Sequence, residues 1–320
     1  MNTYSLENFI RGLKSLKRAS TKFGLAPHKP VLLLTFIEMI DKGMISENRV
    51  FLNSDLVGIF QENWQLLVDT PHQSDFTQPF FYLQNDKIQS NPFWFLKPKP
   101  GYSINSHIKS VNTLSEVLDY GYFLPELYFY LSNRDSREIL KTALLDNYFP
   151  NDLRNFFQAK TGQEGYLDQL ELYVLNKATS PKTSIRISQE EVIFVRNGIF
   201  KKMIPKIYNN SCCFTGLRLT SLHGYSLIDA CHIVPFSYNQ NDTISNGLAL
   251  CPNMHRAFDR GLLTVDNSFR IIVSKHIYED ETHPYSLKLL GGVKIKLPFE
   301  KDYFPSQENL AWHRENIFKG

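Results

Sequence analysis

Residues 226–266 read SLIDACHIVPFSYNQNDTISNGLALCPNMHRAFDRGLLTVD, and this stretch decides the fold of the C-terminal part. It begins with an apolar, β-prone segment that carries His232 and continues through a polar loop to Asn246. A second short apolar run follows, and a helix is predicted to open at Pro252 and to carry His255. The pattern is therefore strand, loop, strand and helix, with a histidine on the first and the last of these elements.

These three polar side chains suit the hydrolysis of a phosphodiester bond. That reaction needs a base to deprotonate water, a cation to stabilise charge on the phosphate, and a rigid frame. An imidazole, whose ordinary pKa is about 6.5, is partly neutral near pH 7, so His232 can act as the base. His255 can bind a divalent metal through one ring nitrogen, and the amide of Asn246 can tie the loop to the strands.

Several segments resemble the ββα-metal fold of HNH endonucleases, over roughly residues 190–320. They are CCFTG at 212–216, DACHIVPF at 229–236, SNGLALCPNMHRAFDRG at 245–261, and the apolar runs that follow. The resemblance implies that His232 is the general base, Asn246 organises the loop, and His255 is a metal ligand. It also implies Mg²⁺ or Mn²⁺ as the cofactor, double-stranded DNA as the substrate, and products with 5′-phosphate and 3′-hydroxyl ends.

The remaining metal ligands are less directly specified. Asp259 follows His255 by one helical turn on the same face, where a second ligand can sit, although a helix-end hydrogen bond is the alternative. Many HNH enzymes carry aspartate immediately before the base, but here that position is Cys231, and thiolates bind Mg²⁺ poorly. In a regular strand, Asp229 lies on the same side as Cys231, because side chains two residues apart point to the same face. The predicted metal set is Asp229, His255 and Asp259, with Cys231 as the alternative and a structural role open for Asp229.

The cysteines give no sign of a further metal site. All four lie in the C-terminal third and form no C-x₂-C pair, which argues against a structural zinc ion. They are Cys212, Cys213, Cys231 and Cys251.

The N-terminal half resembles the sulfur-binding domain that precedes HNH modules in phosphorothioate-dependent restriction endonucleases. The resemblance rests on APHKPVLLL at 26–34, QPFFYLQND at 78–86 and NPFWFL at 91–96. It implies that Pro79 and Phe80 form an apolar pocket for the backbone sulfur. His28 and Lys29 become candidate DNA contacts, although the residues alone also fit a helix-entry turn there and plain core packing at 79–83.

A second interpretation of the same half is a sensor of modified bases. Phe81, Tyr82 and Trp94 would then stack on a flipped nucleotide. Gln78 also occupies the position before the pocket proline where a tyrosine often stands in sulfur-binding domains.

Composition limits the other possibilities. A hydrophobic content of 42% with 21% charged residues describes a globular protein, and the net charge of +3 permits a nucleic-acid partner without requiring one. The longest apolar run, at 31–40, is half of a membrane span, so we expect no membrane partner. The N-terminus lacks a basic region followed by an apolar one, which predicts a cytoplasmic protein.

The predicted architecture is α+β in two domains: a DNA-recognition domain of helices and short strands at 1–150, a linker region at 151–187, and a ββα-metal nuclease domain at 188–320. Helices are expected at 4–20, from Pro30 to Gly43, at 54–68, 111–119, 133–147, from Ser188 to a stop or kink at Pro205, and at 306–317. Short strands and loops are expected from residue 71 to 104, and a hairpin around 266–268.

The predicted function is a modification-dependent DNA restriction endonuclease, with a homodimer plausible because two strands require two cuts. Within the enzyme class, the alternative is an HNH endonuclease that senses a modified base or an unmodified sequence. Outside it, the alternative is a non-catalytic DNA-binding protein with a decayed HNH fold.

Overall fold

The chain forms two compact units. The computed structural model describes residues 4–151, 156–157, 160, 165–175, 188–219 and 226–320. One unit comprises residues 1–169 and 181–195, and the other comprises 170–180 and 196–320. Among the helices of the described ranges, none is long and apolar enough to cross a membrane. Much of the predicted linker at 151–187 lies outside the described residues, and a helix, α9 (Tyr166–Val174), occupies part of the rest.

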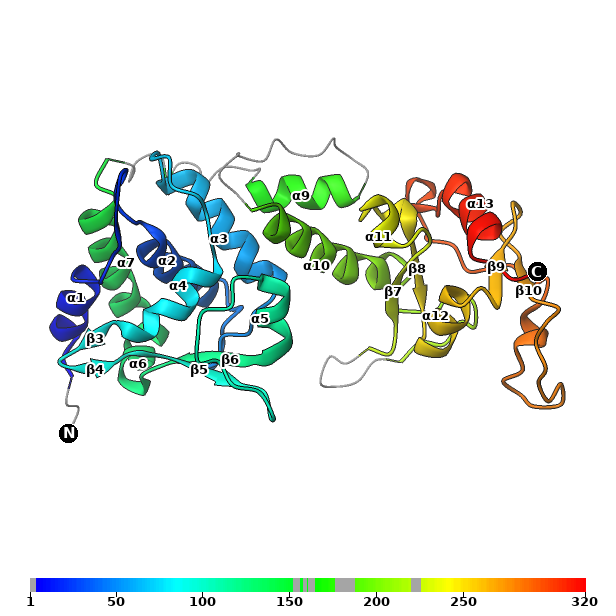
Figure 1. The fold of residues 1–320 in the computed structure, drawn as a ribbon, viewed down its shortest axis with the longest axis horizontal. Helices are drawn as coiled ribbons and strands as arrows, with labels where there is room; N and C mark the ends of the chain where they lie inside the picture. Colours follow the sequence, from blue (N-terminus) through cyan, green and yellow to red (C-terminus); the bar gives the residue numbers. More distant parts are fainter. Residues whose placement is uncertain (1–3, 152–155, 158–159, 161–164, 176–187, 220–225) are drawn as a thin grey trace. The chain divides into compact units, whose positions relative to one another are not determined.

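A buried helix organises the N-terminal unit. The helices are α1 (Leu6–Lys14), α2 (His28–Asp41), α3 (Ser54–Leu67), α4 (Thr77–Tyr82), α5 (Val111–Val117), α6 (Pro125–Ser132) and α7 (Arg134–Tyr148). Helix α2 contacts α3, α4, α6 and α7, and almost every residue from its first turn onward is buried (Figure 1). A helix that is apolar on all sides must be enclosed in this way.

Short antiparallel strand pairs complete this unit. They are β1 (Ser20–Thr21) with β2 (Gly24–Leu25), β3 (Lys87–Ile88) with β4 (Asn91–Pro92), and β5 (Trp94–Pro98) with β6 (Leu118–Phe123). Trp94 stands opposite Phe123, and Phe36 of α2 stacks on the Trp94 ring with centroids 4.8 Å apart. The sheet therefore closes the core through its aromatic residues.

Helix α4 corrects the prediction of strands and loops from residue 71. The 3-10 turn η1 (Leu83–Asn85) continues it, and strands begin only at β3. The Asp75 carboxylate accepts the backbone N–H of Gln78 at 3.0 Å, which caps the helix start, and Pro79 fits the first turn. Phe76 and Phe80 then pack one helical turn apart in the core, with ring centroids 5.2 Å apart.

Other boundaries differ from the prediction in smaller ways. Helix α1 ends at Lys14 rather than near residue 20. Strand β6 and helix α6 were not anticipated, because the aromatic-rich sequence at 118–132 has no clear period.

Helix α10 (Gln189–Ile207) begins directly after Ser188, where its start was predicted. It continues two residues past Pro205, so the proline does not stop it there. Near the start of this helix, Glu191 is buried, and its carboxylate accepts the backbone N–H of Phe76 at 2.7 Å. Burial raises the pKa of Glu191 to about 7, and the nearby negative charge of Asp75 adds to the shift.

The C-terminal unit contains the predicted strand–loop–strand–helix. Its elements are β7 (Asp229–His232), α11 (Phe236–Asn239), η2 (Ile244–Asn246), β8 (Gly247–Leu250), α12 (Pro252–Asp259), β9 (Leu263–Val265), β10 (Ile271–Val273), η3 (Leu287–Leu290), η4 (Lys301–Tyr303) and α13 (Gln307–Asn316). Strand β7 pairs antiparallel with β8, and α12 contacts both strands (Figure 1). The predicted β9–β10 hairpin and final helix are confirmed, as is the mixed α+β class.

Candidate active site

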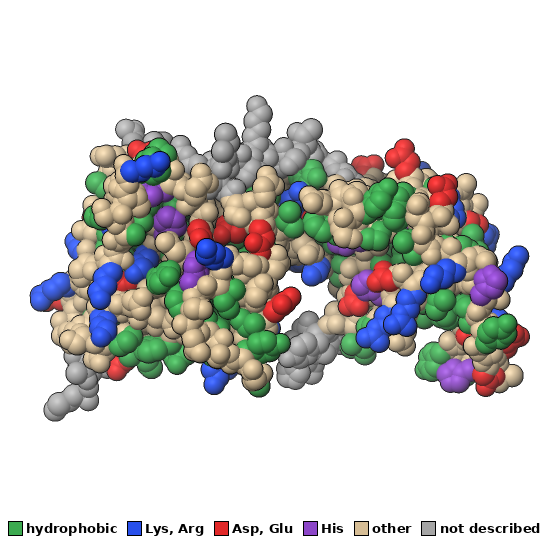
Figure 2. Space-filling view, in the orientation of Figure 1, with side chains coloured by type: hydrophobic (Ala, Val, Ile, Leu, Met, Phe, Trp, Pro, Cys, Tyr) green, Lys and Arg blue, Asp and Glu red, His purple; other side chains and the backbone are tan. Residues whose placement is uncertain are grey.

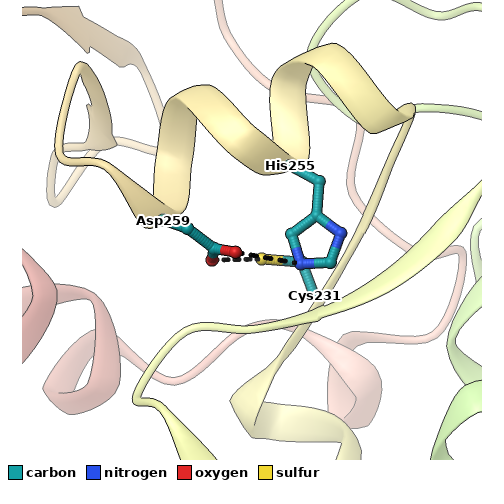
Figure 3. A group of neighbouring side chains, drawn as sticks. All are labelled: Cys231, His255 and Asp259. Carbon is teal, nitrogen blue, oxygen red and sulfur yellow. Dashed lines mark hydrogen bonds and ion pairs between the residues drawn. The ribbon is translucent and has the colours of Figure 1, made fainter.

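Three side chains from β7 and α12 converge in the C-terminal unit (Figure 3). They are Cys231, His255 and Asp259, and each offers one potential ligand atom within 4.8 Å of the others. Nε2 of His255 lies 3.4 Å from Oδ2 of Asp259, which follows it by one helical turn. Oδ1 of Asp259 accepts the Cys231 thiol at 3.7 Å. The helix thus brings imidazole and carboxylate to one point, as the i, i+4 spacing predicted.

Asp229 lies beside this group but on the other side of the imidazole. Its Oδ2 is 3.3 Å from Nδ1 of His255, whereas Asp259 approaches Nε2. The convergent group contains Cys231 in place of the predicted Asp229. A carboxylate on the second ring nitrogen fixes the ring orientation and tautomer of a metal-binding histidine.

The donor set suits a hard divalent cation only in part. Mg²⁺ binds through one or two carboxylates and keeps several waters, so Asp259 and His255 fit such an ion. Cys231 is fully buried, and this burial raises the pKa of its thiol well above the usual range, with the Asp259 charge acting in the same direction. A buried neutral sulfur is a poor partner for Mg²⁺, so the acceptable ligands are His255 and Asp259.

His232 is held rigidly on three sides. Its Nε2 lies 3.0 Å from Oδ1 of Asp242, and its ring stacks on Phe200 at 4.0 Å with an interplanar angle of 11°. Phe236 packs against the ring at 5.9 Å. Asp242 is fully buried and is also contacted by Arg196 at 3.4 Å. These contacts leave Nδ1 of His232 without a partner among the residues that the structure describes.

The two histidines line one cavity of about 240 Å³. Asp259, Phe236 and His313 line it too. His313 cannot serve as a base, because Nδ1 bonds the Thr264 hydroxyl and Nε2 bonds the Phe258 carbonyl. Burial lowers the pKa of His313 to about 4. His232 is therefore the cavity histidine with a ring nitrogen available for proton transfer.

Asn246 acts on the backbone rather than on the cavity. It is fully buried, and its Oδ1 accepts the Val234 N–H at 2.9 Å. Its Nδ2 donates to the carbonyls of Val234 and Asn241, both at 3.0 Å. It thereby ties the loop that carries Asp242 to the chain just after His232.

Sequence reasoning missed Asp242, Arg196 and Phe200. Asp242 lies in the polar loop NQNDT, where no periodicity marks it, and the other two lie on α10 more than thirty residues before His232. The one available signal was an acidic residue that follows three consecutive amide side chains.

The N-terminal unit has a pocket of about 450 Å³ around the predicted recognition residues. Four of the residues predicted to contact the DNA or its modification line it: His28, Lys29, Pro79 and Tyr82. Residues not predicted also line it: Lys17, Arg18, Ala19, Ala26, Gln78 and Asn85. The pocket combines small apolar side chains with cations.

Three of the predicted contacts do not reach this pocket. Phe80 is fully buried in the core, where Trp94 donates its Nε1–H to the Phe80 carbonyl at 2.9 Å. Trp94 is also fully buried, which excludes it from stacking on a flipped base. Phe81 lies outside the pocket, half-buried against Tyr82 and His107.

Lys29 was predicted to contact DNA, but its charge is already paired within the protein. Its ammonium group is paired with Asp86, which is almost fully buried. The second oxygen of Asp86 accepts the Lys17 N–H at 2.6 Å. The pair therefore fixes the pocket wall. The side chains of Lys17 and Arg18, which form no ion pair with another described residue, carry the remaining positive charge of the lining.

Comparison with known families locates the catalytic module. Residues 212–266 match the HNH endonuclease family (HNH_2). The C-terminal unit carries an HNH endonuclease domain. This match covers β7, β8 and α12 and so includes His232, Asn246 and His255, and it supports a nuclease rather than a module of another class.

More distant comparisons add little. One solved structure that resembles the chain is described as a "Modification dependent TagI restriction endonuclease", at 20% identity and a TM-score of 0.31. The similarity covers 38% of this chain and 39% of that one, and so weak a likeness carries no argument about substrate. No curated protein matches the chain.

Proposed function

We propose that the protein is a modification-dependent DNA endonuclease. Its N-terminal unit would sense a phosphorothioated backbone, and its C-terminal unit would hydrolyse a phosphodiester bond. The observation that carries the proposal is that His232, His255 and Asp259 line one cavity within an HNH domain. A base and a candidate cation site that face one space are what phosphodiester hydrolysis requires.

In this mechanism His232 removes a proton from the attacking water. Asp242 accepts the Nε2–H, which leaves the Nδ1 lone pair free for that proton. As the imidazole gains charge, the buried carboxylate of Asp242 stabilises it. Phe200 and Phe236 fix the plane of the ring, so little reorganisation is needed when the proton moves.

The cation would be held by His255 and Asp259, with Asp229 orienting the imidazole. When bound, Mg²⁺ or Mn²⁺ stabilises charge on the phosphate and on the departing 3′-oxygen. Cys231 packs beneath this pair as a buried thiol.

The N-terminal pocket supports the sensing role. Sulfur in place of a phosphate oxygen is softer and less hydrated, so contact with Pro79, Ala19 and Ala26 favours it over oxygen. Lys17 and Arg18 can hold the charge of the diester, which gives affinity without sequence information.

The test offers the whole protein three matched duplexes with Mn²⁺: phosphorothioated, base-methylated and unmodified. We expect cutting of the phosphorothioated duplex alone, and no cutting by His232→Ala. Cutting of the unmodified duplex alone would rule out modification sensing, and equal activity of His232→Ala would rule out the proposed base. The methylated arm is included because Tyr82 lines the pocket and its ring lies 5.5 Å from His107, so a stacked base is the second candidate ligand.

A homodimer is part of the proposal, because cleavage of both strands needs two such sites. Mass measurement by light scattering, with and without DNA, tests it. A monomer in both conditions, combined with double-strand cleavage, would contradict it.

A further inference from the structure

A groove of about 900 Å³ lies on the nuclease unit outside the cavity of His232 and His255. Three segments form it: the turn at 214–217, one face of α12, and the chain from 284 to 293. None of the residues assigned above to base or metal chemistry lines it. It therefore calls for an explanation of its own.

The groove exposes apolar side chains that folding leaves uncovered. Tyr285 is 84% exposed and Leu289 60%, and Leu217 and Val293 are exposed as well. Buried apolar residues, including Phe214, form the floor between them. A contiguous apolar surface of this kind, bounded by polar residues, is typical of a ligand or partner site.

The groove is also positively charged. Arg256 of α12 and Arg260, which directly follows the helix, line it; both are exposed, and neither guanidinium has an ion-pair or hydrogen-bond partner within the described ranges. No acidic residue is among the described residues of its lining. Figure 2 shows Lys and Arg side chains gathered on the nuclease unit beside acidic and histidine side chains. A cationic rim over an apolar floor suits a nucleotide, because the phosphate is anionic and the face of the base is apolar.

The position on α12 connects the groove to the cut. In the sequence HRAFDR, each candidate metal ligand is followed directly by an arginine: His255 by Arg256, and Asp259 by Arg260. Consecutive helical residues differ by about 100° around the axis. Arg256 therefore lies on the helix face next to the metal-binding face, and Arg260, the C-cap of α12, follows Asp259 in the same way.

We propose that this groove binds one nucleotide of the cleaved strand, adjacent to the scissile phosphate. Its own phosphate lies on Arg256 and Arg260, and its base, unstacked from the duplex, lies against Tyr285 and Leu289. The inference rests on the proposed nuclease function and adds a substrate property to it. A paired duplex presents phosphates and sugars but few base faces, so the apolar lining favours a nucleotide that has left the stack.

The first experiment measures cutting by the full chain with Mn²⁺. The substrates are the duplex that the three-duplex panel identifies and the same duplex with one unpaired nucleotide beside the mapped cut. We expect the wild type to prefer the unpaired substrate, and Tyr285→Ala to reduce that preference by about 5- to 100-fold, the usual range for a base stacked on an aromatic ring. Tyr278→Ala is the matched control, since Tyr278 is fully exposed and lies outside the groove, shortly before the segment that begins at residue 284.

The second experiment measures binding of a short single-stranded oligonucleotide in a His232→Ala background at several salt concentrations. Arg256→Gln/Arg260→Gln should lower the slope of log K against log salt by about 0.7 for each phosphate that the arginines neutralise in the wild type. Lys275→Gln/Lys301→Gln, which removes two exposed cations outside the groove, should leave the slope unchanged.

The outcomes separate the two proposals. If Tyr285→Ala keeps the wild-type preference, or if the arginine variant keeps the wild-type slope, the groove does not hold the cleaved strand and belongs to another occupant, such as an acidic peptide. If His232→Ala still cuts, the proposed nuclease mechanism fails, whatever the groove variants do.

Discussion

Replacing Asp242 with asparagine tests how the proposed base is held. The substitution keeps the volume of the side chain but removes the charge from a fully buried site. Asp242 lies 3.0 Å from Nε2 of His232, and a hydrogen bond to a charged group contributes about 1.5–3 kcal/mol. Since about 1.4 kcal/mol corresponds to a factor of ten in rate, we expect kcat to fall by about 10- to 100-fold. An amide that donates to Nε2 would also favour the wrong tautomer.

The assay is single-turnover cleavage at saturating enzyme, which separates the chemical step from DNA binding. Asp302→Asn is the control, because Asp302 is exposed on the same unit. Binding should change little, and a thermal melt should show that the variant remains folded. A folded Asp242→Asn protein that cuts at the wild-type rate would refute the claim that this carboxylate positions His232. Loss of binding with unchanged kcat would refute it as well.

Three further predictions concern stability. Asn246→Ala should lower the free energy of unfolding by about 3 kcal/mol in urea titrations, because it removes three hydrogen bonds to backbone groups, two of them buried; an unchanged midpoint would contradict its bracing role. Gly261→Ala should cost a similar amount, about 3 kcal/mol, since Gly261 has a φ of +71° and a Cβ would lie 2.0 Å from the Ile317 carbonyl oxygen; a neutral result would contradict the close approach. The raised pKa of Glu191, about 7 against 4.5, means that the folded state retains a proton which the unfolded chain loses, so stability is highest below pH 4.5 and falls as pH rises to 7. Glu191→Gln should remove this fall, up to about 3 kcal/mol, whereas Glu190→Gln should retain it; parallel pH profiles for wild type and Glu191→Gln would refute the assignment.

The nuclease half could be predicted from sequence because its determinants are local. The apolar runs around His232 and before Pro252 have the length of short strands, and Pro252 marks the start of the helix. The i, i+4 spacing of His255 and Asp259 places both side chains on one face of that helix. The positioning of His232 could not be predicted in the same way. Phe200 and Asp242 reach it through tertiary packing and a loop conformation, and neither leaves a periodic signal.

The N-terminal half was harder to predict from local sequence. The pocket gathers His28 and Pro79, which lie about fifty residues apart, and only the family resemblance related them before the structure did. The helix at α4 was hidden because proline and consecutive aromatic residues favour strands and turns, and the Asp75 cap that overrides them lies outside the motif. Because this helix was not predicted, Phe80 was assigned to the pocket, whereas its ring is buried in the core.

If the N-terminal pocket binds a DNA backbone as proposed, the buried partner of Lys29 should affect which anions compete for it. Free phosphate, nucleotides and polyphosphates carry two or more negative charges and are abundant in cells, so a site with every cation unpaired would fill with them. Because Asp86 neutralises Lys29 and leaves two of the three cations of the lining uncompensated, the pocket should attract multiply charged anions less strongly than it would without that carboxylate. Removing that carboxylate should therefore broaden the site towards small phosphates rather than improve it as a reader of DNA.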